Sequence, residues 1–296
     1  MAGPTRLRAV HPAPARRGPR GAAGGCAARG RAGEDRQAAR DRQAHRARAH
    51  RAARRAGHVH RARAACRDPR LRIVDDGVYL SLKPQSAKTI VTCLARFGGR
   101  PVGIVANQPR QLGGILDNDS ADKAARFVSL CNAFGLPLVF LQDVPGFMVG
   151  TKVEAAGIIR HGAKMLHAVA AATVPKVTIV LRKAYGAGYY VMNGRAYESD
   201  LIVAWPTAEI SVMGAEGAVE IVMRRQVEEA DDPQAKRAEL IAAYRQIIDV
   251  YVAARNGMID DAIDPRETRP VTCCPLEMAE GKTVQRPWGR NAVVPV

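Results

Sequence analysis

The amino-acid sequence predicts an α/β fold with a mostly parallel sheet, and three observations support this prediction. Short apolar runs rich in β-branched residues alternate with longer segments whose apolar residues recur at helical spacing. Turns of small residues separate the two kinds of segment. The sequence also lacks a GxGxxG turn with a downstream acid and a GxxxxGK[ST] loop, so a simple nucleotide-binding fold is not favoured.

The expected elements follow in order along the chain. We expect two short strands within 71–95, a glycine hairpin turn at 97–101 and a strand at 102–106. After a polar, glycine-rich loop, Asp119 or Ser120 caps a helix that Gly135 ends. A buried strand at 136–141, a loop at 142–151 and one long helix at 153–172 come next. Strands at 177–181 and 201–205 enclose a short helix near Gly194, and helices follow at 214–227 and 233–254. The tail from 265 shows no clear period.

The first 70 residues differ from the rest in composition. They hold 19 Arg and 4 acidic residues, which accounts for +15 of the net charge of +17. Larger aliphatic residues are rare there and aromatic residues are absent, so this segment cannot bury enough apolar surface to offset chain entropy, and we expect it to be disordered. Its Arg, Ala, Gly and Pro are typical of GC-rich codons. Out-of-frame translation of residues 1–70 is one hypothesis; a nucleic-acid-binding arm is another, and the missing Lys and aromatics count against it.

Residues 71–296 form the second expected domain, and their charge is nearly balanced. The six cysteines show no CxxC pair and no disulfide spacing, which predicts reduced thiols in a cytoplasmic protein and no metal site. No apolar run is long enough to span a membrane. Nucleic acid and membrane are therefore not the expected partners of this domain.

The stretch from Val174 to Met192 carries the clearest chemical pattern. A buried strand runs into the small-residue turn Gly186, Ala187, Gly188, and a helix begins there. Glycine lets the backbone approach a ligand closely. The first amides of a helix have no acceptor inside it and lie at the positive end of its dipole. The pattern predicts an oxyanion hole built from backbone amides; a turn that serves only packing is the alternative.

Six motifs together resemble the C-terminal half of the carboxyltransferase (β) subunit of biotin-dependent acyl-CoA carboxylases, of the propionyl-CoA carboxylase type. They are GGRPVGIVANQP, LVFLQDVPGFMVG, RHGAKMLHAVA, TVPKVTIVLRKAYGAGYYVM, DLIVAWPTAEISVMGAEGAVEI and IDPRETRPV. This resemblance implies a crotonase/ClpP-like spiral of repeated ββα units. It implies carboxyl transfer from carboxybiotin to an acyl-CoA, with biotin carried by a biotin carboxylase/biotin carrier (α) subunit, and a homo-oligomer with sites between subunits.

The resemblance also assigns roles by position. The amides of Gly186, Ala187 and Gly188 resemble the oxyanion hole for the biotin-side oxygen. The loop formed by Gly146, Phe147, Met148, Val149 and Gly150 is similar to the family's loop that lines the biotin end of the cleft. The resemblance also implies a substrate pocket at Tyr189 and Tyr190. Tyr190 lies near a position where subunits of the propionyl-CoA type often have an acid, so the acyl preference stays open. We find no counterpart of the family's N-terminal half, which supplies the acyl-CoA-side hole, and therefore expect an incomplete enzyme.

Two other functions stay open at this point. One is a crotonase-fold decarboxylase of malonyl-type CoA thioesters, and the other is a nucleic-acid-binding protein that uses the Arg-rich lead. Several side chains that could serve in acid–base chemistry have simpler interpretations. We expect His161 to be a surface or capped histidine, Glu209 an internal hydrogen-bond acceptor and Glu216 a residue near a helix start, while Cys273-Cys274 is too isolated for a metal site.

Overall fold

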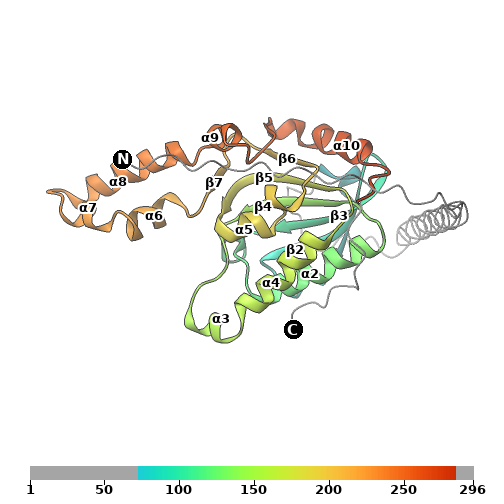
Figure 1. Ribbon diagram of the computed structural model, residues 1–296, viewed down its shortest axis with the longest axis horizontal. Coiled ribbons are helices and arrows are strands. Elements are labelled where there is room, and N and C mark those ends of the chain that lie inside the picture. Colours follow the sequence, from blue (N-terminus) through green and yellow to red (C-terminus); the bar gives the residue numbers. More distant parts are fainter. Residues whose placement is uncertain (1–72, 285–296) are drawn as a thin grey trace, which may run out of the picture. The chain divides into compact units, whose positions relative to one another are not determined.

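A mixed 8-stranded sheet forms the centre of the computed structural model, which describes residues 73–284. The first three strands, β1 (Leu80–Leu82), β2 (Ile90–Phe97) and β3 (Arg100–Asn107), are antiparallel neighbours. The sheet continues in parallel through β4 (Leu138–Val144), β5 (Lys176–Tyr185), β6 (Leu201–Ala204) and β8 (Asp261–Ala262). A short strand, β7 (Glu209–Ser211), pairs with β5 beyond the end of β6 (Figure 1). The α/β prediction with a mostly parallel sheet is confirmed.

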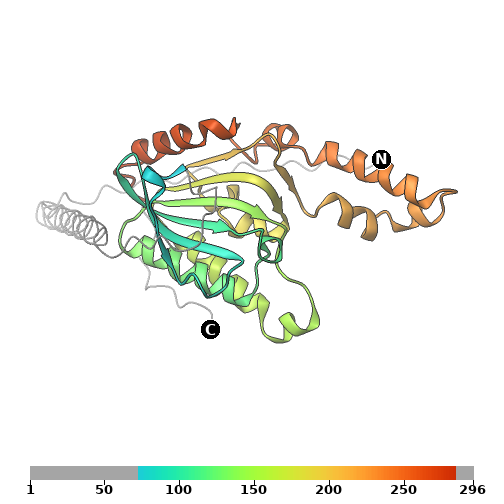
Figure 2. The ribbon, with the colours of Figure 1, turned by 180° about the vertical axis from the view of Figure 1, so that it is seen from behind.

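Helices cover both faces of this sheet, as the two opposite views show (Figures 1 and 2). Alternate residues of β4 point to opposite faces. Phe140 belongs to a core cluster shared with α2 (Asn118–Ala133) and α4 (Ile158–Ala171). Its neighbour Leu141 belongs to a second cluster that Leu276 of α10 (Thr268–Met278) completes. All seven residues of β4 are buried, which explains why a continuous apolar run predicted this strand.

The predicted strands are present, with β4 and β5 extending further towards their carboxyl ends than expected. The hairpin between β2 and β3 turns at Gly98 and Gly99, which both have positive φ. The cap of α2 is Asp117, two residues before Asp119 and three before Ser120, the two predicted caps. Asp117 accepts a hydrogen bond from the Ser120 amide, and the Ser120 hydroxyl accepts one from the Asp117 amide. This reciprocal capping box fixes the helix start at Asn118.

Three segments that the sequence predicts as continuous helices are broken, namely 153–172, 214–227 and 233–254, and one helix was not predicted. The segment 153–172 divides into α3 (Thr151–Ala155) and α4 because Gly157 adopts a left-handed φ of 87°. The segment 233–254 divides into α8 (Pro233–Ile247) and α9 (Val250–Arg255), since Asp249 caps α9 by accepting from the Tyr251 amide. α10 lies in the tail that showed no period, and it contains Pro275. Burial against the sheet stabilises α10 despite that proline.

The remaining elements are short. α5 (Gly186–Val191) follows β5 directly, and the segment 214–227 contains α6 (Ala215–Ile221) and α7 (Arg224–Glu228). Single 3₁₀ turns occupy Asp75–Gly77, Leu112–Gly114, Arg195–Tyr197 and Pro265–Glu267. Two ββα runs are visible in this order, β2–β3–α2 and β6–β7–α6. The predictions for residues 1–70 lie outside the described residues.

Candidate active site

Two loops that are far apart in the sequence meet at the carboxyl ends of β4 and β5. The strands end side by side, with Val144 opposite Ala184 in the register. A Cβ atom added to Gly188 would lie 2.9 Å from Val144 Cγ2 and 3.2 Å from Gly146 Cα. The backbone of α5 therefore packs directly on the start of the loop at 146–150, and only glycine fits at position 188 without displacement. The structure thus brings together the two predicted halves of the site.

The loop at 146–150 is held by backbone bonds to the segment before α2. The Leu116 amide donates to Gly146 O at 3.0 Å, and the Met148 amide donates to Leu116 O at 2.8 Å. Phe147 lies against α4, where a Cβ on Gly162 would be 3.2 Å from its ring. Val149 extends outward with 84% of its surface exposed. The loop is consequently anchored at its first half and open to solvent at its second.

The glycine turn presents the first amides of α5 to this loop. Gly186 has a left-handed φ of 53°, and a Cβ there would approach Val212 O to 2.9 Å. Gly186, Ala187 and Gly188 are the first three residues of α5, so the helical ladder offers no acceptor to their N–H groups. Ala187 is exposed while Gly188 is buried. An acceptor atom that comes from outside the chain could reach this turn at Ala187.

The two adjacent tyrosines occupy different environments. Tyr189 is 1% exposed; its hydroxyl donates to Met258 O at 2.7 Å and accepts from the Arg195 amide at 3.2 Å. Burial raises the pKa of Tyr189, so it stays protonated. Tyr190 is 42% exposed and packs edge-on against the Tyr189 ring. The exposure favours Tyr190 for contact with a ligand, whereas Tyr189 supports it from the core.

A buried acid lies at the same edge of the sheet and was absent from the predicted site. Asp143, the residue before Val144, has its Oδ1 atom 3.3 Å from Nε of Arg182 and 3.4 Å from the Lys183 amide. Its own amide donates to Asn107 Oδ1 at 3.2 Å. Asp143 is 3% exposed, whereas the Arg182 side chain is 55% exposed. The position of Asp143 at the end of a parallel strand is the sequence feature that could have identified it.

The side chains that were expected to be structural are engaged in internal contacts. The Nδ1 atom of His161 lies 2.9 Å from Asp122 Oδ1, and Lys164 Nζ lies 3.3 Å from the same oxygen. Partial burial would raise the pKa of Asp122, but the bonds from these two partners lower it overall. This triad joins α2 to α4.

The two glutamates that were weighed as bases also have internal partners. The Tyr185 hydroxyl donates to Glu209 Oε2, so the prediction of Glu209 as an internal acceptor is confirmed. Glu216 is the second residue of α6 and pairs with Arg245 at 2.6 Å. A hydrogen bond from its own backbone amide, together with Arg245, lowers the pKa of Glu216. Neither carboxylate is available as a free general base.

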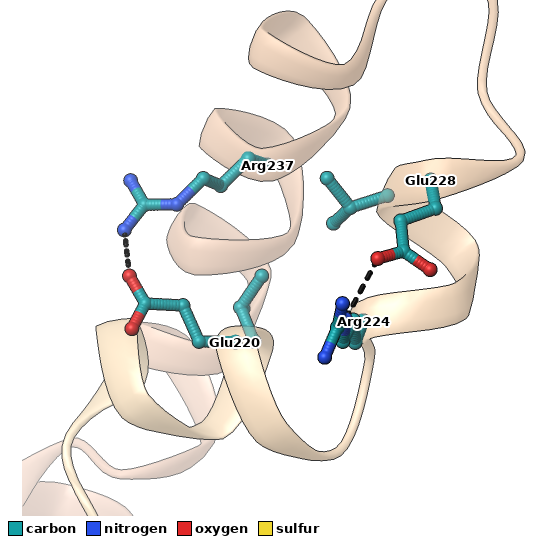
Figure 3. Close-up of a pocket in the computed structure, with 6 residues that line it drawn as sticks. Glu220, Arg224, Glu228 and Arg237 are labelled. Atoms are coloured by element: carbon teal, nitrogen blue, oxygen red, sulfur yellow. Dashed lines mark hydrogen bonds and ion pairs between the residues drawn. The ribbon is translucent and has the colours of Figure 1, made fainter.

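Two open hollows of the described chain lie away from the glycine turn, among α6, α7 and α8. One is about 280 Å³ and is lined by two ion pairs, Arg237 with Glu220 at 2.6 Å and Arg224 with Glu228 at 2.7 Å (Figure 3). The other is about 600 Å³ and shares Arg237. Both are open, and their charges are already paired, so they do not mark the reactive site. Within residues 73–284, no group of three or more His, Cys, Asp or Glu side chains is arranged to hold a metal, and no helix has the length and apolarity to cross a membrane.

The sheet and the paired loops define an α/β domain in which a glycine turn at the start of a helix meets a second loop at the carboxyl ends of two parallel strands. The particular family follows from comparison with known proteins. A family model described as "Carboxyl transferase domain" matches residues 37–294, and the chain belongs to that family. The predicted resemblance is confirmed.

Three relatives show how much of such proteins this chain represents. The methylmalonyl-CoA carboxyltransferase 12S subunit of Propionibacterium freudenreichii subsp. shermanii is 51% identical over 77% of this chain and 44% of its own length. The methylmalonyl-CoA decarboxylase subunit alpha of Propionigenium modestum is 45% identical over 76% of this chain and 44% of its own length. The human mitochondrial propionyl-CoA carboxylase beta chain is 47% identical over 76% of this chain and 40% of its own length.

A solved structure at 51% identity confirms the fold. The crystal structure of transcarboxylase 12S, described as a hexamer assembly with methylmalonyl-coenzyme A and methylmalonic acid bound, matches with a TM-score of 0.72 at 51% identity. The match covers 76% of this chain and 44% of that one. The fold is therefore the mixed α/β, crotonase-like fold of carboxyltransferases, and the chain spans less than half the length of the curated relatives it matches.

Proposed function

We propose that this chain supplies the biotin-side half of a carboxyltransferase site, in which a carboxyl group passes between biotin on a partner subunit and an acyl-CoA. The observation that carries the proposal is the contact between two loops, in which Gly188 packs on Val144 and Gly146 at the carboxyl ends of two parallel strands. Family membership supports the reaction class. Substrate and partners of the whole enzyme are part of the proposal, because the chain spans only part of its relatives.

The chain's own residues contribute through the backbone. When bound, biotin would supply a ureido nitrogen that carries the carboxyl group and a ureido carbonyl oxygen that gains negative charge when the group leaves. The amides of Ala187 and Gly188 at the start of α5 are the proposed donors to that oxygen, with Gly186 providing the turn. Preorganised donors of this kind contribute about 10²- to 10³-fold in rate each. The exposed Ala187 and the lack of a Cβ at Gly146 leave room for the ring, so the residues present fit the group.

The loop and the second tyrosine are assigned supporting roles. Gly146, Phe147, Met148, Val149 and Gly150 are proposed to border the biotin end, with the exposed Val149 giving an apolar contact. Tyr190 is proposed to face the acyl group, and the core residue Tyr189 supports it. Arg182, beside the buried Asp143, keeps a positive charge near both loops. That charge would favour an anionic carboxyl group at the site.

The proposed partners follow from the same site. They are a biotin carrier subunit, an acyl-CoA and further copies of the chain, because one of the matched structures is described as a hexamer assembly in a multienzyme core. We also propose that the protein works in the cytoplasm. Four cysteines are free in the described chain, and burial raises the pKa of Cys131 to about 12, which keeps it a thiol.

The experiment that tests this function measures propionyl-CoA formation from methylmalonyl-CoA by the full 296-residue chain. A biotinylated carrier domain is added in one arm and its unbiotinylated form in the other. Both arms are repeated with an added N-terminal half of the 12S relative. We expect propionyl-CoA formation that requires the biotinylated carrier. Equal formation with both carriers would instead support decarboxylation without biotin, and no formation in any arm would contradict both functions. The decarboxylase alternative is retained because one relative at 45% identity bears that name.

A further inference from the structure

Tyr185 occupies the junction between β5 and the proposed oxyanion hole. It is the last residue of β5 and the residue immediately before Gly186, with extended backbone angles. Its side chain is 6% exposed, and its hydroxyl donates to Glu209 Oε2 on β7. The residue that ends the strand is therefore fixed by a side-chain bond, as well as by the sheet, one peptide before the turn.

At the end of β5, few backbone hydrogen bonds from the neighbouring strand help the bond between Tyr185 and Glu209 to hold Tyr185 in place. β6 pairs with β5 only along Val177 to Val180. Beyond that point the same side of β5 is covered by β7, whose three residues pair with Lys183, Ala184 and Tyr185. Glu209 is the first residue of β7 and forms an isolated bridge with Asp249. A three-residue strand gives a weak hold by itself, and the bond between Tyr185 and Glu209 reinforces it.

The segment after β7 also encloses the turn at two further points. A Cβ on Gly214 would lie 3.0 Å from the Tyr185 ring, and a Cβ on Gly186 would lie 2.9 Å from Val212 O. The ring, its hydroxyl and the next peptide are thus each in contact with a different residue of 209–214. A displacement of Tyr185 along this wall would rotate the peptide that leads into Gly186.

The hydroxyl keeps its role as donor over the whole physiological range. Burial, followed by the hydrogen bond to Glu209 and the charges of Glu209 and Glu216, raises the pKa of Tyr185 above its usual range. A protonated tyrosine facing a carboxylate gives a charge-assisted hydrogen bond, which is stronger than one between neutral groups.

We propose that the hydrogen bond from Tyr185 to Glu209 is a positioning contact that sets the direction of the amides at Gly186 to Gly188. Neither residue touches the substrate in this inference; both act through the turn. The inference rests on the proposed carboxyl-transfer function for its importance to catalysis. The orientation of the turn itself can be measured without any activity.

Four variants of the full chain, together with one double variant, test the inference. Tyr185→Phe removes the hydroxyl and keeps the ring against Gly214, and Glu209→Leu removes the acceptor. Glu209→Gln keeps an acceptor oxygen and is the conservative rescue. Tyr251→Phe is the matched control, because Tyr251 is 63% exposed. All four are compared by the amide NMR signals of Ala187 and Gly188 in the ligand-free chain, and by carrier-dependent propionyl-CoA formation.

In Tyr185→Phe and in Glu209→Leu, we expect displaced Ala187 and Gly188 signals and about tenfold faster amide exchange there, with unchanged signals in β4. We expect kcat to fall about tenfold while KM changes less than about twofold, because a misdirected turn affects the transition state more than binding. Glu209→Gln should recover most of both effects. The double variant Tyr185→Phe/Glu209→Leu should be no worse than either single one, since both remove the same bond.

The inference is overturned if Tyr185→Phe matches Tyr251→Phe in both amide signals and kcat, or if Glu209→Gln is as impaired as Glu209→Leu. A uniform loss of signals across the sheet in Tyr185→Phe would also overturn it, since the bond would then serve stability and not direction. If the unaltered chain shows no carrier-dependent activity, with or without the added N-terminal half, the proposed function fails, and the amide signals alone still decide whether the pair directs the turn.

Discussion

The glycine turn and the helical segment α6–α8 differ in how tightly they are packed. The turn follows β5 directly, whereas α6–α8 follow β7, which pairs with the end of β5. The turn lies between buried strands, and its contacts leave no space for a single added carbon at Gly186 or Gly188. By contrast, α7 and α8 contain no buried residue. Ile221 and Val222 at the end of α6 are 73% and 70% exposed.

Close packing in this domain is concentrated around the glycine turn. Dense packing transmits small displacements, so a site that works through backbone amides has to rest on a filled core. In the helical segment, each exposed ion pair adds little to the free energy of unfolding. Side chains there can therefore be replaced without destabilising the sheet. Substitutions in the two regions should therefore differ in their effects, and they are taken here in order of decreasing expected size.

The core beneath the turn should be the most sensitive part. Phe140 is 0% exposed on β4, and Phe140→Ala is expected to cost about 3–5 kcal/mol of unfolding free energy through lost burial and a cavity. Ile221→Ala on α6 should cost less than about 0.5 kcal/mol, because the side chain is already in water. Urea unfolding monitored by circular dichroism measures both, and similar costs would remove the distinction between the regions.

A side chain at position 188 should reduce catalytic turnover strongly and the stability of the fold only weakly. Gly188→Ala places a Cβ within 3.2 Å of three atoms of the loop start, and the resulting shift of the amides is expected to reduce carrier-dependent turnover by about 10²- to 10³-fold. Gly217→Ala on α6 is the matched control, since a Cβ there meets nothing within 4 Å. That control should keep full activity, and an active Gly188→Ala enzyme would refute the assignment of the hole.

The triad that joins α2 to α4 should give a smaller, pH-dependent effect. Asp122 has a lowered pKa in the folded chain because His161 and Lys164 outweigh its partial burial. Its stabilisation is therefore present above the unfolded pKa, near 4, and is lost as the pH falls through the lower folded value. Asp122→Asn should cost roughly 0.5–1 kcal/mol at pH 7. Unfolding curves of both proteins should converge at about pH 2–3, and a constant difference down to that pH would contradict this explanation.

The ion pairs of the helical segment should matter least. Arg237 and Glu220 join α8 to α6 at 2.6 Å, with 43% and 62% of their side chains exposed (Figure 3). Arg237→Gln is expected to change the unfolding free energy by less than about 0.5 kcal/mol, and 0.5 M NaCl should erase even that difference. A salt-independent loss would show that the pair is shielded from solvent and that the segment is more tightly packed than its exposure indicates.

Much of the sheet and the location of the site could be predicted because both depend on local patterns. Buried apolar runs gave β3, β4, β5 and β6, and the small-residue turn gave α5. The helix breaks at Gly157 and Asp249 were not predictable from periodicity, since apolar spacing continues across both. α10 was missed because Pro270 and Pro275 suggest an irregular tail, whereas packing of Leu276 against the sheet makes the helix favourable.

The residues that support the site were harder to predict than the site itself. Asp143 and the bond from Tyr185 to Glu209 depend on which strands become neighbours, and β7 pairs with β5 across more than 20 residues of chain. The buried position of Tyr189 next to the exposed Tyr190 likewise comes from the start of a short helix, where successive side chains point in different directions.

The central claim is that the amides at the start of α5 receive an oxygen of biotin. Its most direct test is an NMR titration of the ¹⁵N-labelled full chain with biotin methyl ester, which follows the backbone signals of Ala187 and Gly188. The account predicts that these two amides move downfield in a saturable manner, together with Gly146, and that Gly188→Ala abolishes the change. Signals of these amides that stay constant while others in the chain respond would contradict it.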